Sequence, residues 1–367
     1  MPYPKIDPRK LDVFPLAERP NITRIEEEAL DPASAAPAAG PESDRQIKQL
    51  AEAIRVARSR GAAVMLTYGA HVVKNCCALL VNWLVENGWL THLATQGAGV
   101  IHDWEFAFLG QSGEWVRDNA PVGRFGSWEE TGRWINLAVI AGAAEGLGFG
   151  EAMGRLIQDD GLELPPAEEL RRRITEDPGH ELTAARADLL WTIEQFGLRP
   201  GRHTVNHPFR RYSILACACG RRVPLTVHPG IGYDIIVNHP LYHGGAIGRA
   251  ATTDVRVFTE SVDRLDGGIY LSVGSAIMSP QVFEKAFSAA NNLRRRKGRP
   301  MLSDHRIVIV DIQAGGGWDW SAGEPPKDNP AYYLRYCKSF YRMGGTLEYL
   351  QCDNRVFLAN LVQRLRT

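Results

Sequence analysis

The chain has 367 residues, of which 44% are hydrophobic and 23% charged, a composition typical of one large globular domain or two ordinary ones. Its 42 basic and 42 acidic residues balance, so charge gives no reason to expect nucleic acid or an anionic membrane as a partner. No apolar run is long enough for a membrane span, and the N-terminus lacks the apolar core of a secretion signal. Together with six cysteines in hydrophobic segments, these features predict a cytoplasmic protein with small buried thiols.

The chain opens with an arm rich in proline and alanine, residues 1–43, which we expect to lie over the surface or over a neighbouring subunit. A helix is predicted to begin at Asp44, its cap, because apolar residues follow at helical spacing, and a short apolar strand is predicted over residues 62–67. A helix over residues 72–87 and a strand over 91–95 come next. This alternation predicts a parallel sheet with a crevice where its strands end.

After a more polar segment, the rest of the chain again alternates predicted strands and helices. A long helix is predicted over residues 126–146, and the segment from about 127 to 210 is a candidate helical insertion with solvated charge runs. Four further strands are predicted, each followed by a loop and a helix: residues 223–227, 268–273, 306–312 and 346–351. We therefore predict an α/β fold of the Rossmann-like, doubly wound kind, with a mostly parallel sheet and residues 44–367 as a single domain.

One stretch carries the strongest local pattern. After the strand at residues 91–95 the chain reads Gly97-Ala98-Gly99 and then His102, Asp103 and Glu105. A strand, a Gly-x-Gly turn and a helix start can bring backbone N–H groups and a helix dipole up to an anionic group. The alternative is an ordinary strand-to-helix turn that needs glycine for its dihedral angles.

Polar groups recur at the other predicted strand ends. If the sheet is parallel, they converge on one edge; they are His71, His102, Asp103, His228, Asp234, Asp311, Asp319 and Asp353. Carboxylates there can hold ribose hydroxyls or the ammonium groups of a polyamine, and Trp318 and Trp320 beside Asp319 offer a site for a cation. Taken singly, each of these residues is better explained as structural, either a helix cap or a satisfied core group. The chain has no Walker A motif, Gly-x-Ser-x-Gly elbow or His-Glu-x-x-His motif.

Five segments, in this order, resemble the deoxyhypusine synthase family in its bacterial deoxyhypusine synthase-like branch. The resemblance covers about residues 45–365, and the segments are 66–74 (LTYGAHVVK), 95–105 (TQGAGVIHDWE), 223–234 (VPLTVHPGIGYD), 266–276 (DGGIYLSVGSA) and 347–353 (LEYLQCD). It implies a Rossmann-like homotetramer with NAD near subunit interfaces. The family's activity oxidises spermidine with NAD and transfers the aminobutyl group to an amine through an imine on a lysine.

The resemblance and the strand-end pattern together give the expected site residues. Those expected at the cofactor are Gly69, Ala70, His71, Thr95, Gly97, Gly99, Asp103, Gly274, Ser275 and Asp353. Those expected near the substrate are Asp234, Trp318, Asp319 and Trp320. The expected catalytic groups are His102, Asp103, His228, Asp234 and Lys74, and no metal is expected.

The chain departs from the family at its catalytic lysine. That position falls on Met278 or Ser279, neither of which can form an imine, and the next lysine, Lys285, lies about two helical turns on. The acidic pair before Asp103 has become Ile101-His102, and a further family aspartate falls on Pro229 beside His228. We therefore predict that deoxyhypusine synthesis itself is absent, with Lys74 binding phosphate, replacing the nucleophile or lying on the surface.

Three functions follow from these observations. The first is a divergent NAD-dependent enzyme, of the aminoalkyl transferase or oxidoreductase kind, acting on a polyamine or related small amine with histidine and aspartate as acid/base groups. The second is a non-catalytic homologue that binds NAD or another metabolite. The third is a metal-dependent hydrolase built on His71, His102, Asp103 and His228.

Overall fold

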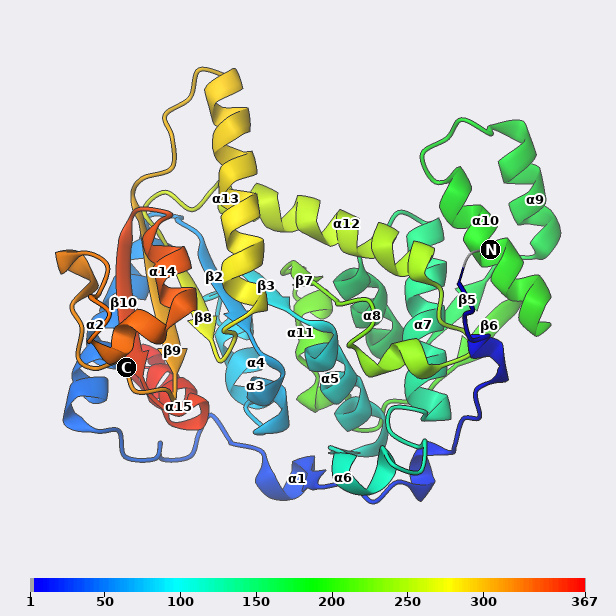
Figure 1. The fold of residues 1–367 in the computed structure, drawn as a ribbon, viewed down its shortest axis with the longest axis horizontal. Coiled ribbons are helices and arrows are strands. Elements are labelled where there is room, and N and C mark those ends of the chain that lie inside the picture. The colour runs from blue at the N-terminus through cyan, green and yellow to red at the C-terminus, as the bar shows by residue number, and fades with distance from the viewer. Residues whose placement is uncertain (1–2, 367) are drawn as a thin grey trace.

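The computed structural model describes residues 3–366 and is built on one six-stranded sheet in which every neighbouring pair is parallel (Figure 1). In spatial order the strands are β10 (Thr346–Gln351), β9 (His305–Asp311), β8 (Gly268–Val273), β2 (Val64–Tyr68), β3 (His92–Thr95) and β7 (Leu225–Val227). Helices follow the strands along the chain. The predicted α/β fold with a Rossmann-like parallel sheet is confirmed.

The strand order reverses once, beside β2. From β2 the chain adds β3 and then β7 in one direction, and it returns to the other side of β2 to add β8, β9 and β10. The carboxyl ends of β2 and β8 therefore lead to connections on opposite sides of the sheet. Such a reversal leaves a crevice at the carboxyl edge, where ligands of doubly wound folds bind.

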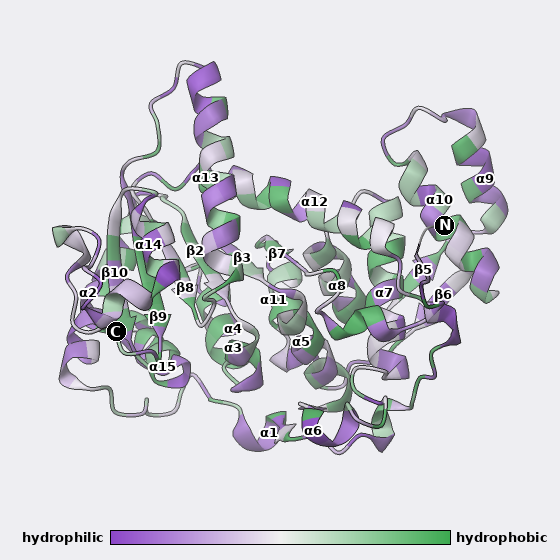
Figure 2. Cartoon of the chain, viewed as in Figure 1, coloured by the Kyte–Doolittle hydropathy of each residue, from purple (hydrophilic) through white to green (hydrophobic). Residues whose placement is uncertain are grey.

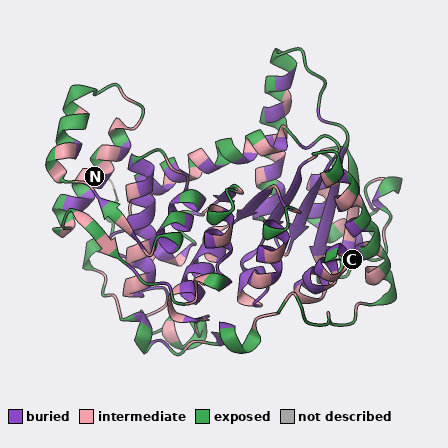
Figure 3. Ribbon diagram, turned by 180° about the vertical axis from the view of Figure 1, so that it is seen from behind, coloured by how far each residue is buried: buried purple, intermediate pink, exposed green. Residues whose placement is uncertain are grey.

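Helices cover both faces of the sheet because alternate strand residues point in opposite directions. In β2, Leu66 packs on one face and Met65 on the other. The first face carries α2 (Pro41–Ser59), α3 (Ala70–Lys74), α4 (Ala78–Glu86) and α15 (Asn354–Arg366). The second carries α12 (Gly244–Val262), α13 (Met278–Arg296) and α14 (Arg335–Tyr341). Figure 3 shows the strands buried between these layers, which explains their near-continuous apolar sequences.

The molecule continues beyond β7. There lie α5 (Gly97–Leu109), α7 (Glu129–Ala144), α8 (Phe149–Gln158) and α11 (Ile214–Gly220). At the end farthest from β10 are α9 (Ala167–Glu176), α10 (Thr183–Phe196) and an antiparallel pair, β5 (Gly161–Leu164) and β6 (Gly201–Thr204) (Figure 1). The predicted helical insertion over residues 127–210 thus also contains a two-stranded ribbon. Its charge runs are solvated, as expected: Arg172 pairs with Glu176 on the exposed side of α9, and Figure 2 shows hydrophilic colour along that helix.

The N-terminal arm lies against its own chain. It contains η1 (Pro8–Lys10), η2 (Leu16–Glu18), β1 (Thr23–Arg24) and α1 (Ile25–Glu28). β1 pairs with β4 (Gln111–Ser112), just after α5 and before α6 (Val116–Asn119). Arg19 inserts its side chain into the interior, where it forms an ion pair with Glu105.

Several element boundaries differ from the sequence-based expectation. The helix predicted over residues 72–87 is two helices, because the chain turns at Cys76, whose φ is +59°. The remaining short turns are η3 (Arg210–Tyr212), η4 (Ile235–Asn238), η5 (Trp320–Ala322) and η6 (Pro330–Tyr333). Among residues 3–366, no helix combines the length and apolar character needed to cross a membrane, and all six cysteines are free.

Candidate functional site

The carboxyl ends of β2 and β8 meet through two glycines. Gly69 donates its N–H to the Val273 carbonyl at 3.0 Å, and a side chain at Gly69 would collide with the carbonyl oxygen of Gly274. Gly274 has a φ of +59°, and a side chain there would project into open space. Two backbones thus approach closely at the point where the strand order reverses, with room above Gly274.

That room is a crevice of about 300 Å³. Polar residues from three segments line it: His71 in α3 with Asn75 just after that helix, Asp311 at the end of β9, and Asp353 and Asn354 after β10. The Asn75 amide donates to the Asn354 amide oxygen at 3.0 Å, which joins two walls of the crevice. These residues come together because parallel strands end at one edge of a sheet.

Each aspartate of the crevice uses one oxygen to hold its own loop. Asp311 Oδ1 accepts the Gln313 N–H at 3.0 Å, and Asp353 Oδ1 accepts the Arg355 N–H at 2.8 Å at the start of α15. In the described part of the chain neither Oδ2 receives a hydrogen bond. The crevice thus presents two carboxylate oxygens that can accept hydroxyl or ammonium donors.

The end of β3 is filled by the protein itself. Asp234 is 4% exposed, and its carboxylate accepts N–H groups from Gly230 at 2.8 Å and from Ala98 in the first turn of α5. A side chain at Gly97 would collide with that carboxylate. Burial raises the pKa of Asp234 to about 6. The Gly97-Ala98-Gly99 turn therefore holds an internal anion, which corrects the expectation that it cradles a cofactor phosphate.

Three further residues expected at the cofactor are committed to the interior. The Asp103 carboxylate accepts the Ser213 hydroxyl and the Ile214 N–H, and so caps α11; burial raises the pKa of Asp103 to about 7. The Thr95 hydroxyl donates to the Tyr68 carbonyl at 3.0 Å, and Gly99 is a glycine because a side chain would strike Thr95. The structure thus corrects the cofactor role of Asp103, Thr95 and Gly99.

His228, expected to be catalytic, belongs to a buried polar series after β7. Its Nε2 lies 3.2 Å from the Thr226 hydroxyl, which lies 3.0 Å from His92 Nε2, and His92 Nδ1 lies 2.8 Å from Ser261 Oγ. Burial lowers the pKa of His228 to about 4 and that of His92 to about 3, so both rings are neutral at pH 7. Sequence reasoning missed His92 because it lies inside an apolar strand.

His102 lies on α5, a helix that packs against α3, and it is not among the residues that line the crevice. Its Nδ1 is 2.8 Å from Ser112 Oγ. Burial lowers the pKa of His102, Glu105 opposes this, and Lys74 and His71 on α3 reinforce it. Neither Lys74 nor His71 has a side-chain hydrogen bond or ion pair within the described residues. None of the expected catalytic groups is among the described residues that line the crevice.

The residues expected at the substrate lie elsewhere. Trp318, Asp319 and Trp320 line a separate groove of about 500 Å³ along β10. Asp319 accepts the Ser321 N–H at 2.9 Å, the Trp318 indole donates to the Gly323 carbonyl at 2.9 Å, and Trp320 is buried against Tyr341. These three residues thus lie away from the crevice and hold their own loop, and the aromatic cation site stays a prediction.

The positions around the missing family lysine are also filled. Ser279 is fully buried, with its hydroxyl 2.9 Å from the Tyr270 hydroxyl, and its N–H donates to Ser275 Oγ at 3.3 Å. Met278 is buried beside them. Lys285 points outward on α13 and pairs with Glu284. No lysine therefore stands in for the family nucleophile on α13.

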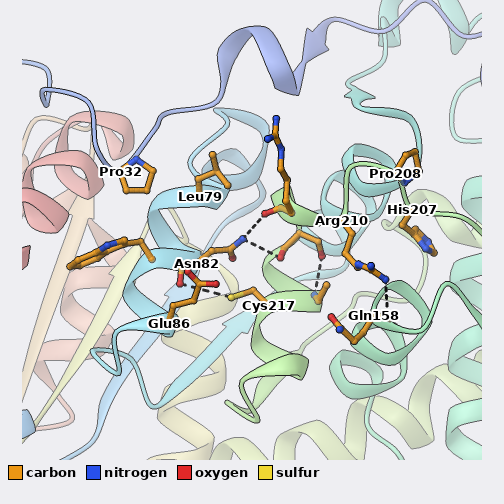
Figure 4. A pocket seen from close by; sticks show the side chains of 13 residues that line it. Pro32, Leu79, Asn82, Glu86, Gln158, His207, Pro208, Arg210 and Cys217 are labelled. Atoms are coloured by element: carbon orange, nitrogen blue, oxygen red, sulfur yellow. Dashed lines mark hydrogen bonds between the residues drawn. The ribbon is translucent and has the colours of Figure 1, made fainter.

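A cavity larger than the crevice lies away from the strand ends. It is a groove of about 620 Å³ between α4 and α11, with Asn82 at its centre (Figure 4). The Asn82 amide donates to the Arg211 and Ser213 carbonyls, and Arg210 is held by Asp160 and the Gln158 carbonyl. None of the site residues expected from the sequence lines this groove. We therefore place the candidate site in the smaller crevice, where the topology requires an opening.

The structure adds three crevice residues to those assigned from the sequence. Asp311 was noted only as one of several strand-end acids, while Asn75 and Asn354 were not singled out. The signal for Asn354 was its place directly after Asp353, and for Asn75 it was a polar residue before two cysteines in an apolar helix. Within residues 3–366 no group of three or more His, Cys, Asp or Glu side chains could hold a metal ion, so the hydrolase hypothesis gains no support.

Comparisons with known proteins are limited to distant structural likeness. No family model and no curated protein matches the chain. Three solved structures illustrate the similarity: ArgZ, an arginine dihydrolase from the ornithine-ammonia cycle in cyanobacteria (14% identity, TM-score 0.41, 89% of this chain and 32% of that one); AgrE in ternary complex with ornithine and NAD⁺ (14%, 0.43, 90% and 34%); and a conserved LOR/SDH protein from Methanococcus maripaludis S2 (12%, 0.41, 91% and 70%). The chain spans about a third of ArgZ and AgrE. Because these TM-scores are below 0.5, no functional conclusion follows from them.

Proposed function

We propose that the crevice at the β2–β8 reversal binds NAD and that the protein oxidises a small amine. The observation that carries this proposal is the close contact of Gly69 with Gly274 beneath a crevice lined by Asp311 and Asp353. A sheet of this topology binds nucleotides at such a reversal, and acidic residues at strand ends bind ribose hydroxyls. Bound NAD supplies a hydride acceptor.

The residues present fit part of such a ligand. Gly274 leaves space for close backbone approach, and the two free carboxylate oxygens suit ribose hydroxyl groups. At about 300 Å³ the crevice is at the lower end of small-molecule sites. We therefore expect it to enclose one half of the dinucleotide, with the other half outside this crevice.

Calorimetric titration with NAD tests the proposal directly. The variant Asp311→Asn/Asp353→Asn keeps an acceptor for each loop N–H but removes both charges from the crevice. We expect its affinity for NAD to fall by at least about tenfold, since hydrogen bonds to charged groups contribute about 1.5–3 kcal/mol each. The matched control is Asp319→Asn, because Asp319 accepts a loop N–H in the same way outside the crevice. Failure of the wild type to bind NAD, or equal losses in both variants, would contradict the proposal.

A second candidate is NAD binding without catalysis. It is favoured by the placement of Asp103, Asp234 and His228, three expected acid/base groups that are engaged inside the protein. The two candidates differ in one measurement, the absorbance of reduced cofactor during incubation with NAD and a panel of polyamines and amino acids. Turnover of any amine supports the oxidoreductase, and binding without turnover supports the second candidate.

We also propose membership in the deoxyhypusine synthase family and assembly as a homotetramer. The support is the position of the five family-like segments, four of which run across the carboxyl end of a strand of the sheet while the fifth begins at one. Exposed apolar side chains on the loops after β7, β8 and β9, namely Ile231, Tyr233, Ile277 and Ile312, also favour coverage by another chain. Light scattering tests the assembly: a monomer at micromolar concentration would contradict it.

A further inference from the structure

The two edges of the six-stranded sheet differ in how they are covered. At one edge, the Val227 N–H of β7 donates to the Asp254 carboxylate at 2.7 Å. Gly150 of α8 lies so close to this edge that a side chain there would strike the Leu225 carbonyl oxygen. The other edge is β10, which is six residues long and pairs only with β9. Its register with β9 is continuous and it contains no proline, so it lacks two of the devices that protect edge strands from pairing.

Alternate residues of β10 direct their main-chain groups away from β9. In a parallel ladder, a residue that bonds to one neighbouring strand is followed by a residue that faces the opposite side. The Cys352 N–H donates to the Asp311 carbonyl at 3.0 Å, so the even-numbered residues face β9. The outward residues are therefore Leu347, Tyr349 and Gln351. The Ser43 hydroxyl confirms this direction, because it donates to the Gln351 carbonyl at 3.2 Å from outside the sheet.

The rest of the outward main chain is unpaired. Within residues 3–366, no group bonds to the N–H groups of the three outward residues or to the carbonyls of Leu347 and Tyr349. The donors and acceptors that a further strand requires are therefore available along β10.

The outward residues line the groove of about 500 Å³ along β10. The start of α2 forms one wall, on the face of the sheet where Leu350 packs. The loop of residues 315–320 forms the other wall, on the face where Tyr349 and Trp320 pack. Both walls lie at the β10 end of the sheet (Figure 1). The groove therefore continues the plane of the sheet, between the same two layers that enclose its strands.

The charges of this groove leave one carboxylate without a cation. Arg45 donates twice to Glu42 at the start of α2. Arg306 pairs with Glu348 at 2.7 Å. Asp319 lines the groove and forms no ion pair within the described residues. A basic side chain on an occupant of the groove would complement Asp319.

We propose that this groove binds an extended peptide segment of a partner protein, which adds to the sheet as a strand beside β10. The unpaired groups of Leu347 and Tyr349 repeat at the spacing of a strand, and an extended main chain presents complementary groups at the same spacing. The segment carries a basic residue opposite Asp319 and has no proline at the paired positions. The groove shares no residue with the crevice, so peptide binding here does not depend on the binding of NAD there.

A peptide selection on the full-length protein tests the proposal. The probe is a random decapeptide library displayed on phage, and the selected peptides are synthesised and titrated by fluorescence anisotropy. We expect these peptides to contain a basic residue and to slow amide hydrogen exchange at Leu347 and Tyr349, whose N–H groups lack an acceptor in the free protein. We expect Asp319→Asn to weaken their binding several-fold.

Two matched pairs of variants locate the binding. Leu347→Pro removes an outward N–H and leaves the ladder with β9 in place, because edge strands accept proline where its missing N–H faces outward. Leu347→Ala shortens the same side chain but keeps the N–H. We expect affinity for the peptides to be about five- to tenfold lower in the proline variant than in the alanine variant, since one main-chain hydrogen bond is lost.

The second pair changes α2 and leaves β10 untouched. Gln46→Trp fills the groove from the α2 wall, whereas Lys48→Trp places the same ring on α2 outside the groove. We expect the first to abolish peptide binding and the second to leave it unchanged. If Leu347→Pro does not fold, as judged by circular dichroism, this pair decides the question.

Three outcomes would overturn the proposal. The first is a set of selected peptides that bind equally to both members of each pair. The second is a selection that yields no peptide able to slow exchange along β10. The third is slow exchange at Leu347 and Tyr349 in the free protein that becomes fast when dilution produces a monomer by light scattering, because a second copy of the chain would then occupy the edge in place of a partner protein.

Discussion

The carboxyl ends of β3 and β2 share one local pattern, a buried strand followed by glycine and a helix. They differ in what occupies the space beside that glycine. After β3, the first turn of α5 receives the carboxylate of Asp234. After β2, Gly69 meets the backbone of Gly274 and an open crevice remains. At the end of β3, the filled end, the chain itself places a carboxylate against the backbone. At the end of β2, the open end, it does not. Changes at the filled end should therefore reduce stability, whereas changes at the open end should reduce ligand binding.

The largest loss of stability is expected on the filled side, from Arg19→Ala. This change leaves the buried Glu105 carboxylate without its charge partner, and such losses cost about 3–5 kcal/mol. Urea unfolding measures the effect. The control is Arg9→Ala on the same arm, where the ion pair with Asp7 is exposed and little change is expected. A loss for Arg19→Ala as small as that of the control would contradict the account.

Gly69→Ala should be the next most damaging change. The added methyl group meets the carbonyl oxygen of Gly274, which belongs to the backbone and cannot rotate away. Overpacking of this kind costs about 1–3 kcal/mol, or more where the neighbour cannot move, and it should abolish NAD binding by displacing β8. At Gly40, where φ is −61° and no atom lies within 4 Å, the same substitution should be harmless. Unchanged affinity in Gly69→Ala would show that the crevice is not the site.

The buried neutral histidines His228 and His92 should make the protein less stable in acid. The folded pKa of His228 is depressed to about 4 from its ordinary 6.5, so its contribution is complete above pH 6.5 and is lost as the pH falls toward 4. The size is on the order of 3 kcal/mol. Comparison with His228→Gln isolates the effect, because Asp234, Asp103 and Asp254 have raised pKa values and act in the opposite direction in both proteins. Identical pH profiles would contradict this account.

The smallest effect is expected at Lys74, on the open side. This lysine has no ion pair within the described residues, so Lys74→Met should change the free energy of unfolding by no more than about 0.5 kcal/mol. Its charge lowers the pKa of His102, and removing it should raise that pKa in an NMR titration. Lys285→Met serves as the control because Lys285 lies on α13 and pairs with Glu284. A His102 titration that responds equally to both variants would contradict the influence of Lys74 on that ring.

The fold was predictable from local pattern because buried parallel strands have near-continuous apolar sequences separated by glycine loops. All six strands of the sheet were located from such runs, and the reversal beside β2 follows from their spatial order, which the sequence does not contain. Gly69, His71, Gly274 and Asp353 were correctly expected to lie at one edge. Their grouping depends only on strand direction.

The partners of the polar groups were not predictable in the same way. Asp103 and Asp234 follow or precede glycine turns just as a ligand-binding aspartate does, but Ser213 and Ala98, which engage them, lie on other segments. Trp320 likewise lies in the core, where its ring contacts that of Tyr341. Contacts with distant segments determine whether such a side chain bonds within the protein or remains available to a ligand. Those contacts cannot be deduced from a single sequence.

A crystal structure of the protein soaked with NAD tests the central claim most directly. We predict that the nucleotide lies over Gly274 with a ribose against Asp311 and Asp353, while Asp234 stays on the first turn of α5. Nucleotide bound at Gly97-Ala98-Gly99 with Asp234 displaced, or in the groove beside Trp318, would contradict the assignment of the open crevice as the functional end of the sheet.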